Sequence, residues 1–258
     1  MRCGMLLLLT LLIVLLSITL VAMFAERDGQ IYRLAAKVVY PISKRWVSAV
    51  DHTVERPFSA SLQKPLPGWR WFQPQLVDKQ FTGEGLQLKS QAETVWWKNQ
   101  RGTAYLSAVT GNVEVEVTVR TRKQSDTANY PDQDYQFGGI MLRNTAGNAL
   151  LSTENYVFNV IGYRGQGLQV ESKSTLAGYS DVSGYDWPSG NARVRIVRKG
   201  SDFYLYAAAV DSQDWVQVNH FNRPDLPDAL ELGLIAYAYS YGAGRHDLQV
   251  TFSDLLLR

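Results

Sequence analysis

The chain has 258 residues, of which 12% are aromatic and 19% are charged, a globular composition with ample apolar material for a sizeable core. Its formal net charge is only +2 and its positive residues are dispersed, which excludes a basic nucleic-acid-binding surface. The one cysteine, Cys3, precedes the folded part, so that part has neither a disulfide framework nor a cysteine metal site.

The N-terminal segment is an apolar run. Residues 3–25 contain no charged side chain, and most of them are Leu, Ile, Val or Met. A helix of that length spans a hydrocarbon core of about 30 Å. A cleaved signal peptide has a shorter apolar region, about 7–15 residues, and a small-x-small cleavage site, which Met23 before Ala25 matches poorly. We therefore expect residues 1–25 to be an uncleaved transmembrane anchor that joins the chain to the membrane.

Residues 26–67 connect this anchor to the rest of the chain. Apolar residues recur at helical spacing from Ile31 to Val39, Pro41 interrupts them, and a similar pattern continues beyond it. This pattern predicts a short helical stalk in two pieces, which either lies along the membrane surface or packs on the domain. Prolines and glycines up to Gly68 then mark a linker.

From residue 68 the periodicity changes from helical to alternating. Val113, Val115, Val117 and Val119 alternate with polar residues, which predicts a half-buried strand. Further strands are predicted at 135–143, 156–163, 168–173, 192–198, 203–209, 230–241 and 248–257. Many short strands without interleaved helices are typical of a sandwich or barrel. We expect residues 68–258 to form one all-β domain.

Several segments resemble a known family in their order along the chain. The run from Tyr135 to Arg143 is similar to the Q-A-G-L-M-L-R strand of concanavalin A-like lectin/glucanase sandwiches, and Arg195 to Trp215 is similar to one of their hairpins. Leu232-Gly233-Leu234 and Phe252-Ser253-Asp254 resemble the later motifs of domains related to a yeast regulator of enolase and of the C-terminal sandwich of family 43 β-xylosidases. The resemblance implies a two-sheet jelly roll whose concave face binds sugars or carries glycosidase carboxylates. Fold analogy alone establishes neither activity.

Catalytic carboxylates are poorly supported. A glycosidase needs two carboxylates about 5–10 Å apart, and the Glu-x-Asp-x-x-Glu pattern of glucanase relatives does not occur in the β domain. Glu114 and Glu116 share one strand face, but a solvated outer face opposite the valines is the simpler interpretation. Glu154 and Asp134 are weaker candidates. We therefore predict no catalytic residue.

Metal and nucleophile sites are also poorly supported. His220 and His246 lie in no nucleophile motif and lack ligand spacing. Asp126, Asp132 and Asp134 could bind calcium, although a solvated loop fits their spacing better. We predict no metal ligand and no cofactor, and leave calcium at this loop open.

Aromatic residues give the stronger indication. Tyr237, Tyr239 and Tyr241 alternate with small residues and are expected to project from one face, where a row of rings could stack on sugars. Packing in the core is an equally good interpretation of the three tyrosines. Three more aromatic residues could join the row, and one arginine could donate paired hydrogen bonds to a ligand. These candidate ligand-binding residues are Trp97, Tyr156, Trp187 and Arg143.

Three functions follow from these patterns. The first is a membrane-anchored, non-catalytic carbohydrate-binding module, the second a glycoside hydrolase with a non-standard carboxylate pair, and the third a structural domain of an envelope assembly. Lys and Arg residues around the anchor do not favour export of the domain. The resemblance nevertheless implies an extracytoplasmic domain on a single-pass membrane protein with a glycan ligand.

Overall fold

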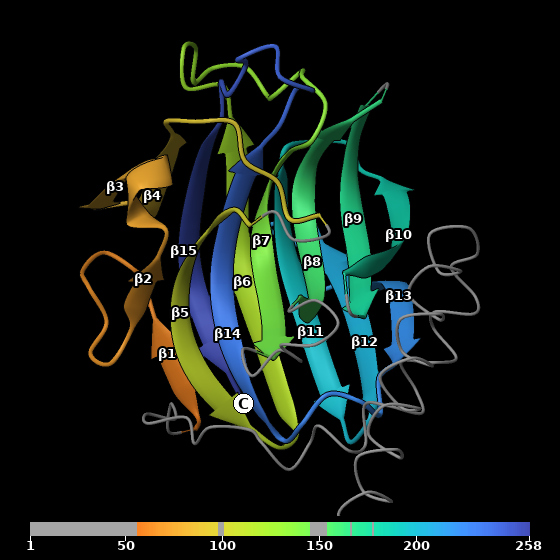
Figure 1. Ribbon diagram of the computed structural model, residues 1–258. Coiled ribbons are helices and arrows are strands. Elements are labelled where there is room, and N and C mark those ends of the chain that lie inside the picture. Colours follow the sequence, from red (N-terminus) through yellow and green to blue (C-terminus); the bar gives the residue numbers. More distant parts are fainter. Residues whose placement is uncertain (1–55, 98–100, 145–153, 166, 177) are drawn as a thin grey trace, which may run out of the picture. The chain divides into compact units, whose positions relative to one another are not determined.

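A computed structural model describes residues 56–97, 101–144, 154–165, 167–176 and 178–258 (Figure 1). The expected anchor, residues 1–25, and the expected helical stretch up to residue 55 lie outside the described residues. No helix in the described ranges is long and apolar enough to span a membrane. These ranges form strands β1 to β15 and one short 3-10 helix, η2 (Pro74–Leu76), so the all-β prediction is confirmed.

Two antiparallel sheets make the two layers of a sandwich. Sheet A, in the order β10-β9-β8-β7-β14-β5-β2, consists of β2 (Arg70–Phe72), β5 (Thr103–Thr110), β7 (Gln136–Asn144), β8 (Asn155–Arg164), β9 (Gly167–Leu176), β10 (Tyr179–Asp186) and β14 (Ala229–Ala238). Sheet B, in the order β13-β12-β11-β6-β15-β4-β3 with β1 paired to β15, consists of β1 (Phe58–Ala60), β3 (Val77–Thr82), β4 (Gly85–Ser90), β6 (Val113–Arg122), β11 (Asn191–Lys199), β12 (Asp202–Ala208), β13 (Val216–Asn222) and β15 (Gln249–Leu257).

Strand β6 shows how the sequence builds the layer between the sheets. Its four valines, Val113 to Val119, are at most 3% exposed and belong to the main core cluster. Successive side chains of a strand point to opposite faces, so these valines line one face of the strand and the polar residues the other. Each side chain of this size stabilises the fold by about 1.5–3 kcal/mol when fully buried.

The sandwich begins before residue 68, the start that the sequence predicted, because residues 58–62 belong to it. Strand β1 pairs with β15, and Leu62 is 1% exposed within the core between the sheets.

Strand β14 is shorter than predicted, because it stops at Ala238, three residues before the expected end of that strand. Tyr241 has a φ of 55°, a left-handed conformation that a regular strand does not use.

Close contacts explain why the strand that carries the family resemblance contains the glycine pair Gly138 and Gly139. A methyl group at Gly138 would lie 2.3 Å from Cγ1 of Val250, which belongs to β15 of the opposite sheet. Its neighbour Gly139 would bring a Cβ atom within 2.2 Å of the Asn159 carbonyl oxygen. Neither position accepts a larger side chain without a shift, because sheet B approaches closely at Gly138 and the neighbouring strand β8 of sheet A does so at Gly139.

The outer face of sheet A carries a second apolar cluster. It lies on the side of the sheet that faces away from sheet B, and it is separate from the core between the sheets. Its buried members are Val95, Trp96, Ala104, Leu106, Phe137, Met141, Tyr156, Phe158, Val160, Ile235 and Tyr237. An outer face with so many buried rings is covered by other parts of the chain, and this cover shapes the candidate site.

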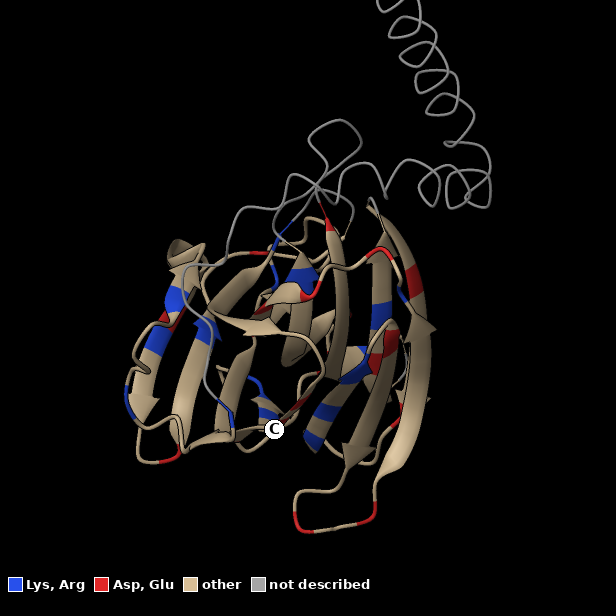
Figure 2. Cartoon of the chain, turned by 90° about the horizontal axis from the view of Figure 1, so that it is seen from below, with Lys and Arg blue, Asp and Glu red and all other residues tan. Residues whose placement is uncertain are grey.

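Charged residues are spread over both sheets. Figure 2 shows Lys and Arg interspersed with Asp and Glu, without a large region of one sign. This distribution agrees with the small net charge of the chain. It also means that any charge preference of a site has to come from a few local residues.

Candidate ligand-binding site

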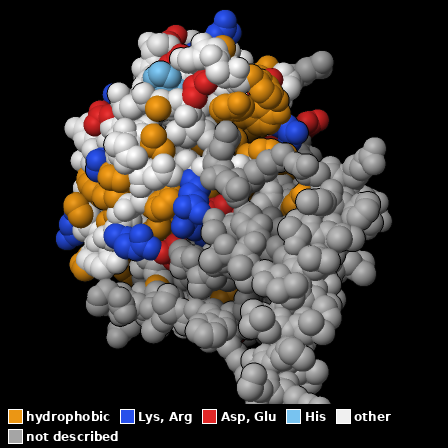
Figure 3. All heavy atoms as spheres, viewed as in Figure 1, with side chains coloured by type: hydrophobic (Ala, Val, Ile, Leu, Met, Phe, Trp, Pro, Cys, Tyr) orange, Lys and Arg blue, Asp and Glu red, His pale blue; other side chains and the backbone are white. Residues whose placement is uncertain are grey.

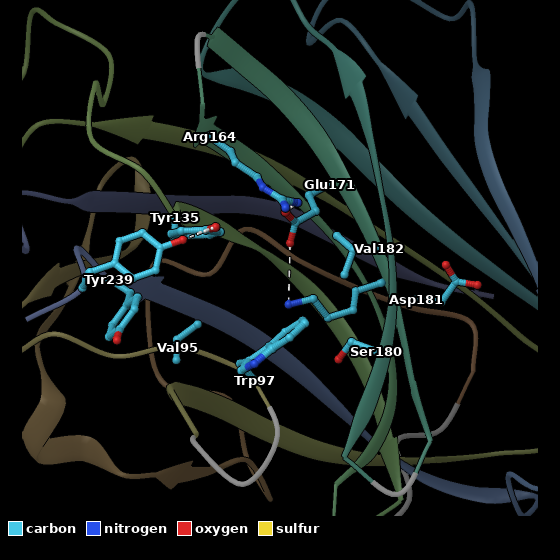
Figure 4. A pocket seen from close by; sticks show the side chains of 11 residues that line it. Val95, Trp97, Tyr135, Arg164, Glu171, Ser180, Asp181, Val182 and Tyr239 are labelled. Carbon is cyan, nitrogen blue, oxygen red and sulfur yellow. Dashed lines mark hydrogen bonds and ion pairs between the residues drawn. The ribbon is translucent and has the colours of Figure 1, made fainter. Parts of the chain in front are cut away.

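A cavity of about 940 Å³ opens on the outer face of sheet A (Figure 4). The volume is within the range of about 300–1,000 Å³ that is usual for small-molecule sites. The lining residues come from β8, β9 and β10, from the segments next to β7 and β14, and from the segment after β4. They are Val95, Trp97, Tyr135, Arg164, Glu171, Lys173, Ser180, Asp181, Val182, Tyr239 and Tyr241.

Three tyrosine rings form one wall. The ring centroids of Tyr135 and Tyr241 lie 5.5 Å apart, and those of Tyr239 and Tyr241 lie 5.4 Å apart. The hydroxyls of Tyr135 and Tyr241 form a hydrogen bond of 2.6 Å, which raises the pKa of Tyr241. In the space-filling view, hydrophobic side chains gather in a patch on this face, beside both basic and acidic side chains (Figure 3).

Tyr135 and Tyr241 also share an unfavourable backbone conformation. Their φ angles are 57° and 55°, values that cost a residue with a Cβ about 1 kcal/mol or more. Both residues lie outside the strands, Tyr135 directly before β7 and Tyr241 three residues after the end of β14. Strained residues of this kind concentrate at functional sites, and two of them here meet across one wall.

A second wall comes from the covering segment, residues 91–97, which follows β4 and crosses the outer face of sheet A. The Thr94 amide donates to the Ala238 carbonyl at 2.7 Å, and the Ser240 hydroxyl donates to the Glu93 carboxylate, which lowers the pKa of Glu93. The Trp96 side chain of this segment is fully buried in the apolar cluster on the outer face of sheet A. These anchors hold Trp97 at the cavity with 42% of its surface exposed.

A charged cluster forms the floor. Arg164 donates to Oε2 of Glu171 at 3.0 Å, and the Tyr237 hydroxyl donates to Oε1 at 3.2 Å. The Nζ atom of Lys173 lies 3.7 Å from the same Oε1. Glu171 and Lys173 are two residues apart on β9, so their side chains leave the same face of sheet A.

Lys173 is the most perturbed cation of the floor. Its side chain is 5% exposed, its ammonium donates to the Trp96 carbonyl at 3.0 Å, and it lies 5.3 Å from the Trp97 ring centroid and 4.8 Å from that of Phe158. Burial disfavours the charged form and lowers the pKa of Lys173 to about 8, although Glu171 acts in the opposite direction.

The structure brings three of the residues singled out in the sequence to the cavity: Trp97, Tyr239 and Tyr241. The expected row of tyrosines on one face continues inward to Tyr237, which is fully buried between Phe137 and Phe158. Tyr237 therefore supports the floor from beneath through its hydrogen bond to Glu171 and offers no exposed ring to a ligand.

The remaining three candidates lie away from the cavity wall. Tyr156 is fully buried, stacks on Phe158, and donates from its hydroxyl to the Trp96 carbonyl at 2.9 Å, so it fixes the covering segment from below. Arg143 is 7% exposed on the same outer face, with its guanidinium over the Phe72 ring and near Glu231.

Trp187 lies beyond the end of β10. It packs against the main core, and its Nε1 donates to the Asn191 carbonyl at 2.9 Å. Both its ring and its polar atom therefore have structural partners.

Sequence reasoning missed the floor. Glu171 and Lys173 stand in a strand with alternating polarity, where charged side chains normally face solvent. The signal that they are buried is the apolar outer face of the neighbouring strand, Tyr156 to Val160, but that pattern becomes informative only once the register of β8 and β9 is known. Tyr135, directly before β7, and Arg164, the last residue of β8, were missed as well.

The carboxylates considered for catalysis have other partners. Glu116 accepts hydrogen bonds from Arg193 and Arg195 on the outer face of sheet B, and Glu114 pairs with Arg258. These residues line no part of the cavity. The solvated-face interpretation needs one change, because Glu116 is only 5% exposed beneath its arginines.

The aspartates of the loop after β6 do not converge on one point. Asp126 accepts from Ala128 and Asn129, Asp132 pairs with Lys123, and Asp134 accepts from Gly165. Over the described ranges, no group of three or more His, Cys, Asp or Glu residues is placed to hold a metal ion.

No known sequence family and no curated protein matches the chain. Several solved structures do match the chain. A functionally unknown protein from Saccharomyces cerevisiae is 20% identical with a TM-score of 0.59, and the match covers 74% of this chain and 96% of that one. The basic winged bean lectin, solved with Tn-antigen, is 10% identical with a TM-score of 0.51, and the match covers 78% and 96%. The described domain has the concanavalin A-like sandwich fold.

A third match agrees with the resemblance to family 43 enzymes. The xyloglucan PUL GH43B protein of Bacteroides ovatus is 12% identical with a TM-score of 0.57, and the match covers 80% of this chain. It covers only 40% of the Bacteroides protein, so this chain spans less than half of that protein's length. At these identities the likeness establishes the fold and leaves the activity to the site.

Proposed function

We propose that this chain is a membrane-anchored carbohydrate-binding protein that holds a glycan, without cleaving it, in the cavity on the outer face of sheet A. The observation that carries the proposal is the combination of aromatic walls and a fixed polar floor around one open cavity. The lectin and the xyloglucan-associated protein among the similar structures have the same fold and support this choice of ligand class.

The walls suit the apolar faces of sugar rings. Trp97 offers a half-exposed indole on one side, and Tyr239 and Tyr241 offer rings on the other. An aromatic ring combines a large apolar contact area with a polar edge, which matches a sugar that has C–H groups on its face and hydroxyls at its rim. The Ser180 hydroxyl and the charged floor supply further hydrogen-bonding groups.

The floor favours binding over hydrolysis. A glycosidase places two carboxylates about 5–10 Å apart across the bond that it cleaves. Both oxygens of Glu171 already have partners, Arg164 on one and Tyr237 with Lys173 on the other. The second carboxylate of the lining, Asp181, points away from Glu171 in Figure 4. A carboxylate held in this way orients other groups and is poorly available as a nucleophile.

The anchor belongs to the same proposal. The apolar run of residues 3–25 is long enough to span a bilayer, and it would tether the binding domain to a membrane surface. We propose an extracytoplasmic domain, because polysaccharides and glycoconjugates are reached from that side. Carbonate extraction of membranes from cells that express the full chain should leave it in the membrane fraction, and release of a soluble form would contradict the anchor.

A glycan array probed with the full chain in detergent micelles tests the binding proposal. We expect selective binding to a group of related glycans, and weaker binding by at least about tenfold for Tyr239→Ala, because truncation of an anchoring aromatic residue typically costs more than 1 kcal/mol. Tyr204→Ala, on sheet B, is the matched control and should bind as the unchanged chain does.

Two outcomes would contradict the proposal. If no glycan binds, the cavity is not a carbohydrate site. If a bound oligosaccharide is recovered shortened, the domain is a hydrolase and the non-catalytic part of the proposal is wrong.

A further inference from the structure

The cavity floor holds more positive than negative charge. One carboxylate, Glu171, is shared by two cations, Arg164 and Lys173, and one oxygen is also occupied by the Tyr237 hydroxyl. Taken together, the three ionisable groups of the floor carry a charge of about +1 at neutral pH. Because Glu171 and Lys173 are almost fully buried, water provides little of the compensation that it gives to surface charges.

The excess positive charge of the floor lies on Lys173. An ammonium group has three N–H donors. Within the described ranges, the Trp96 carbonyl is the acceptor found within hydrogen-bond distance of Nζ, since the nearer Glu171 oxygen is 3.7 Å away. Lys173 lines the cavity, and its ammonium lies 3.7 Å from Oε1 of Glu171 and 5.3 Å from the Trp97 ring centroid. It therefore has donor capacity left for a ligand.

The carboxylates on the surrounding elements make their hydrogen bonds outside the floor, and among the described residues the ion pair of Lys173 is with Glu171. Glu93 on the covering segment accepts from Ser240, and Asp134 beside β7 accepts from the Gly165 amide. Asp181 on β10 points away from the floor. Of its charged neighbours, Glu171 raises the pKa of Lys173 and Arg164 lowers it.

Aromatic rings of the cavity walls lie beside both cations of the floor. Trp97 flanks Lys173 directly, and the Arg164 guanidinium lies 5.4 Å from the Tyr135 ring centroid, so each cation stands beside one wall. A ligand that fits both features has an apolar ring face for the walls and an acidic substituent at its edge for the floor. A sugar whose ring carries a carboxylate has this combination.

We propose that the cavity is specific for carboxylated sugars, with the ligand carboxylate bound by Lys173 and Arg164 while its ring lies between Trp97 and the tyrosine wall. This inference rests on the proposed glycan-binding function and narrows it to one substrate class. Charge-assisted hydrogen bonds to a buried ammonium are among the stronger polar contacts in proteins. The bound carboxylate would supply the negative charge that the floor lacks.

The pKa of Lys173 gives the proposal a pH signature. A bound anion favours the ammonium form, so the pKa of Lys173 should rise in the complex above its value of about 8 in the free protein. Affinity for an acidic sugar should then be constant well below pH 8 and should fall as the pH rises above 8. Affinity for a neutral sugar should not fall in this way.

The experiment compares acidic oligosaccharides with their neutral counterparts. Short oligomers of galacturonic, mannuronic and glucuronic acid, each with its methyl ester, are titrated against the full chain in detergent micelles at pH 6.5 and pH 9.5. For at least one of the three we expect the acid to bind about tenfold or more tightly than its ester at pH 6.5. Most of this preference should be lost at pH 9.5.

Variants locate the effect. Lys173→Met keeps the chain length, removes the charge, and should remove most of the preference for the acid over the ester at both pH values, leaving the contribution of Arg164. Lys199→Met, at an exposed position at the end of β11, is the control and should keep the preference. A melting curve for each variant shows whether it is folded, and the pH series of the unchanged chain tests the proposal without any variant.

The outcomes separate this inference from the function on which it rests. If neutral glycans bind and no acid binds better than its ester, carboxylate specificity is overturned and glycan binding stands. If the preference for acids is unaffected in folded Lys173→Met or unaffected by pH, Lys173 is not its source. If neither acidic nor neutral glycans bind, the proposed function itself fails.

Discussion

The outer faces of the two sheets each carry a buried glutamate between two cations, and the two clusters differ in how complete they are. On sheet B, Glu116 accepts from Arg193 and from Arg195 at 2.5–3.2 Å, so both of its oxygens are fully engaged by guanidinium groups. On sheet A, Glu171 hydrogen-bonds Arg164, while Lys173 stays 3.7 Å away.

The surroundings of the clusters differ too. The Trp215 ring lies against both arginines of sheet B, 3.7 Å from the Arg195 guanidinium and 4.8 Å from that of Arg193, and these arginines remain 16–19% exposed to water. Lys173 is 5% exposed and borders a cavity. A glutamate between two cations thus makes a closed surface network in one place, with two arginines, and an incomplete, desolvated site in the other, with one arginine and one lysine. The incomplete site is the better candidate for ligand binding.

The largest effect is expected inside the sheet A cluster, at Tyr237. Tyr237→Ala should lower the free energy of unfolding by about 3–5 kcal/mol, because it removes a fully buried ring between Phe137 and Phe158 and also the donor to Glu171. Tyr239→Ala, at the half-buried cavity wall, should cost about 1 kcal/mol or less. Urea denaturation of both variants measures the difference, and similar losses would mean that Tyr239 is a core residue.

A matched pair of glutamate variants addresses the clusters directly. Glu171→Gln leaves Lys173 buried without a counter-charge and should cost about 3 kcal/mol, the lower end for breaking a buried pair. Glu116→Gln should cost about 1 kcal/mol, since its arginines can turn to water. Chemical denaturation of both variants at pH 7 measures the two losses in the free energy of unfolding. A larger loss for Glu116→Gln than for Glu171→Gln would contradict the expectation that the sheet A cluster is the one that depends more on its carboxylate.

The pH dependence of stability gives a smaller effect with a definite sign. The pKa of Lys173 is about 8 in the folded protein and 10.5 ordinarily, so between these values the unfolded chain binds more protons. Stability should therefore rise with pH in this window, by about 2 kcal/mol between pH 7.5 and pH 10 relative to Lys173→Met. Subtracting the stability of Lys173→Met at each pH cancels the contribution of the buried tyrosines, which both proteins share. A flat difference would mean that Lys173 titrates normally in the folded state.

Much of the fold was predictable from the sequence because alternation is a local signal. The valines of β6 and the resemblance around Gly138 and Gly139 indicated a sandwich, and Gly138 proves to stand where the two sheets approach closely. The short strand β1 was missed, because three residues after a proline give no period to recognise.

The candidate site was predictable only in part. The alternation of Tyr237 and Tyr239 correctly indicated one face, but burial within that face depends on the covering segment, which crosses the sheet from far along the chain. Glu171 and Lys173 have the sequence signature of a solvated strand face. Their burial is a tertiary property, produced by Trp96 and Tyr156 above and beside them.

Two tryptophans provide the most direct test of the claim that the sheet A cavity binds glycan. Trp97 lines this cavity, whereas Trp215 covers the arginines of the closed cluster on sheet B. Isothermal titration of the full chain with the best glycan from the array should show affinity reduced by at least about tenfold for Trp97→Ala and unchanged for Trp215→Ala. Unchanged affinity for a folded Trp97→Ala, or a loss confined to Trp215→Ala, would contradict the assignment of the site.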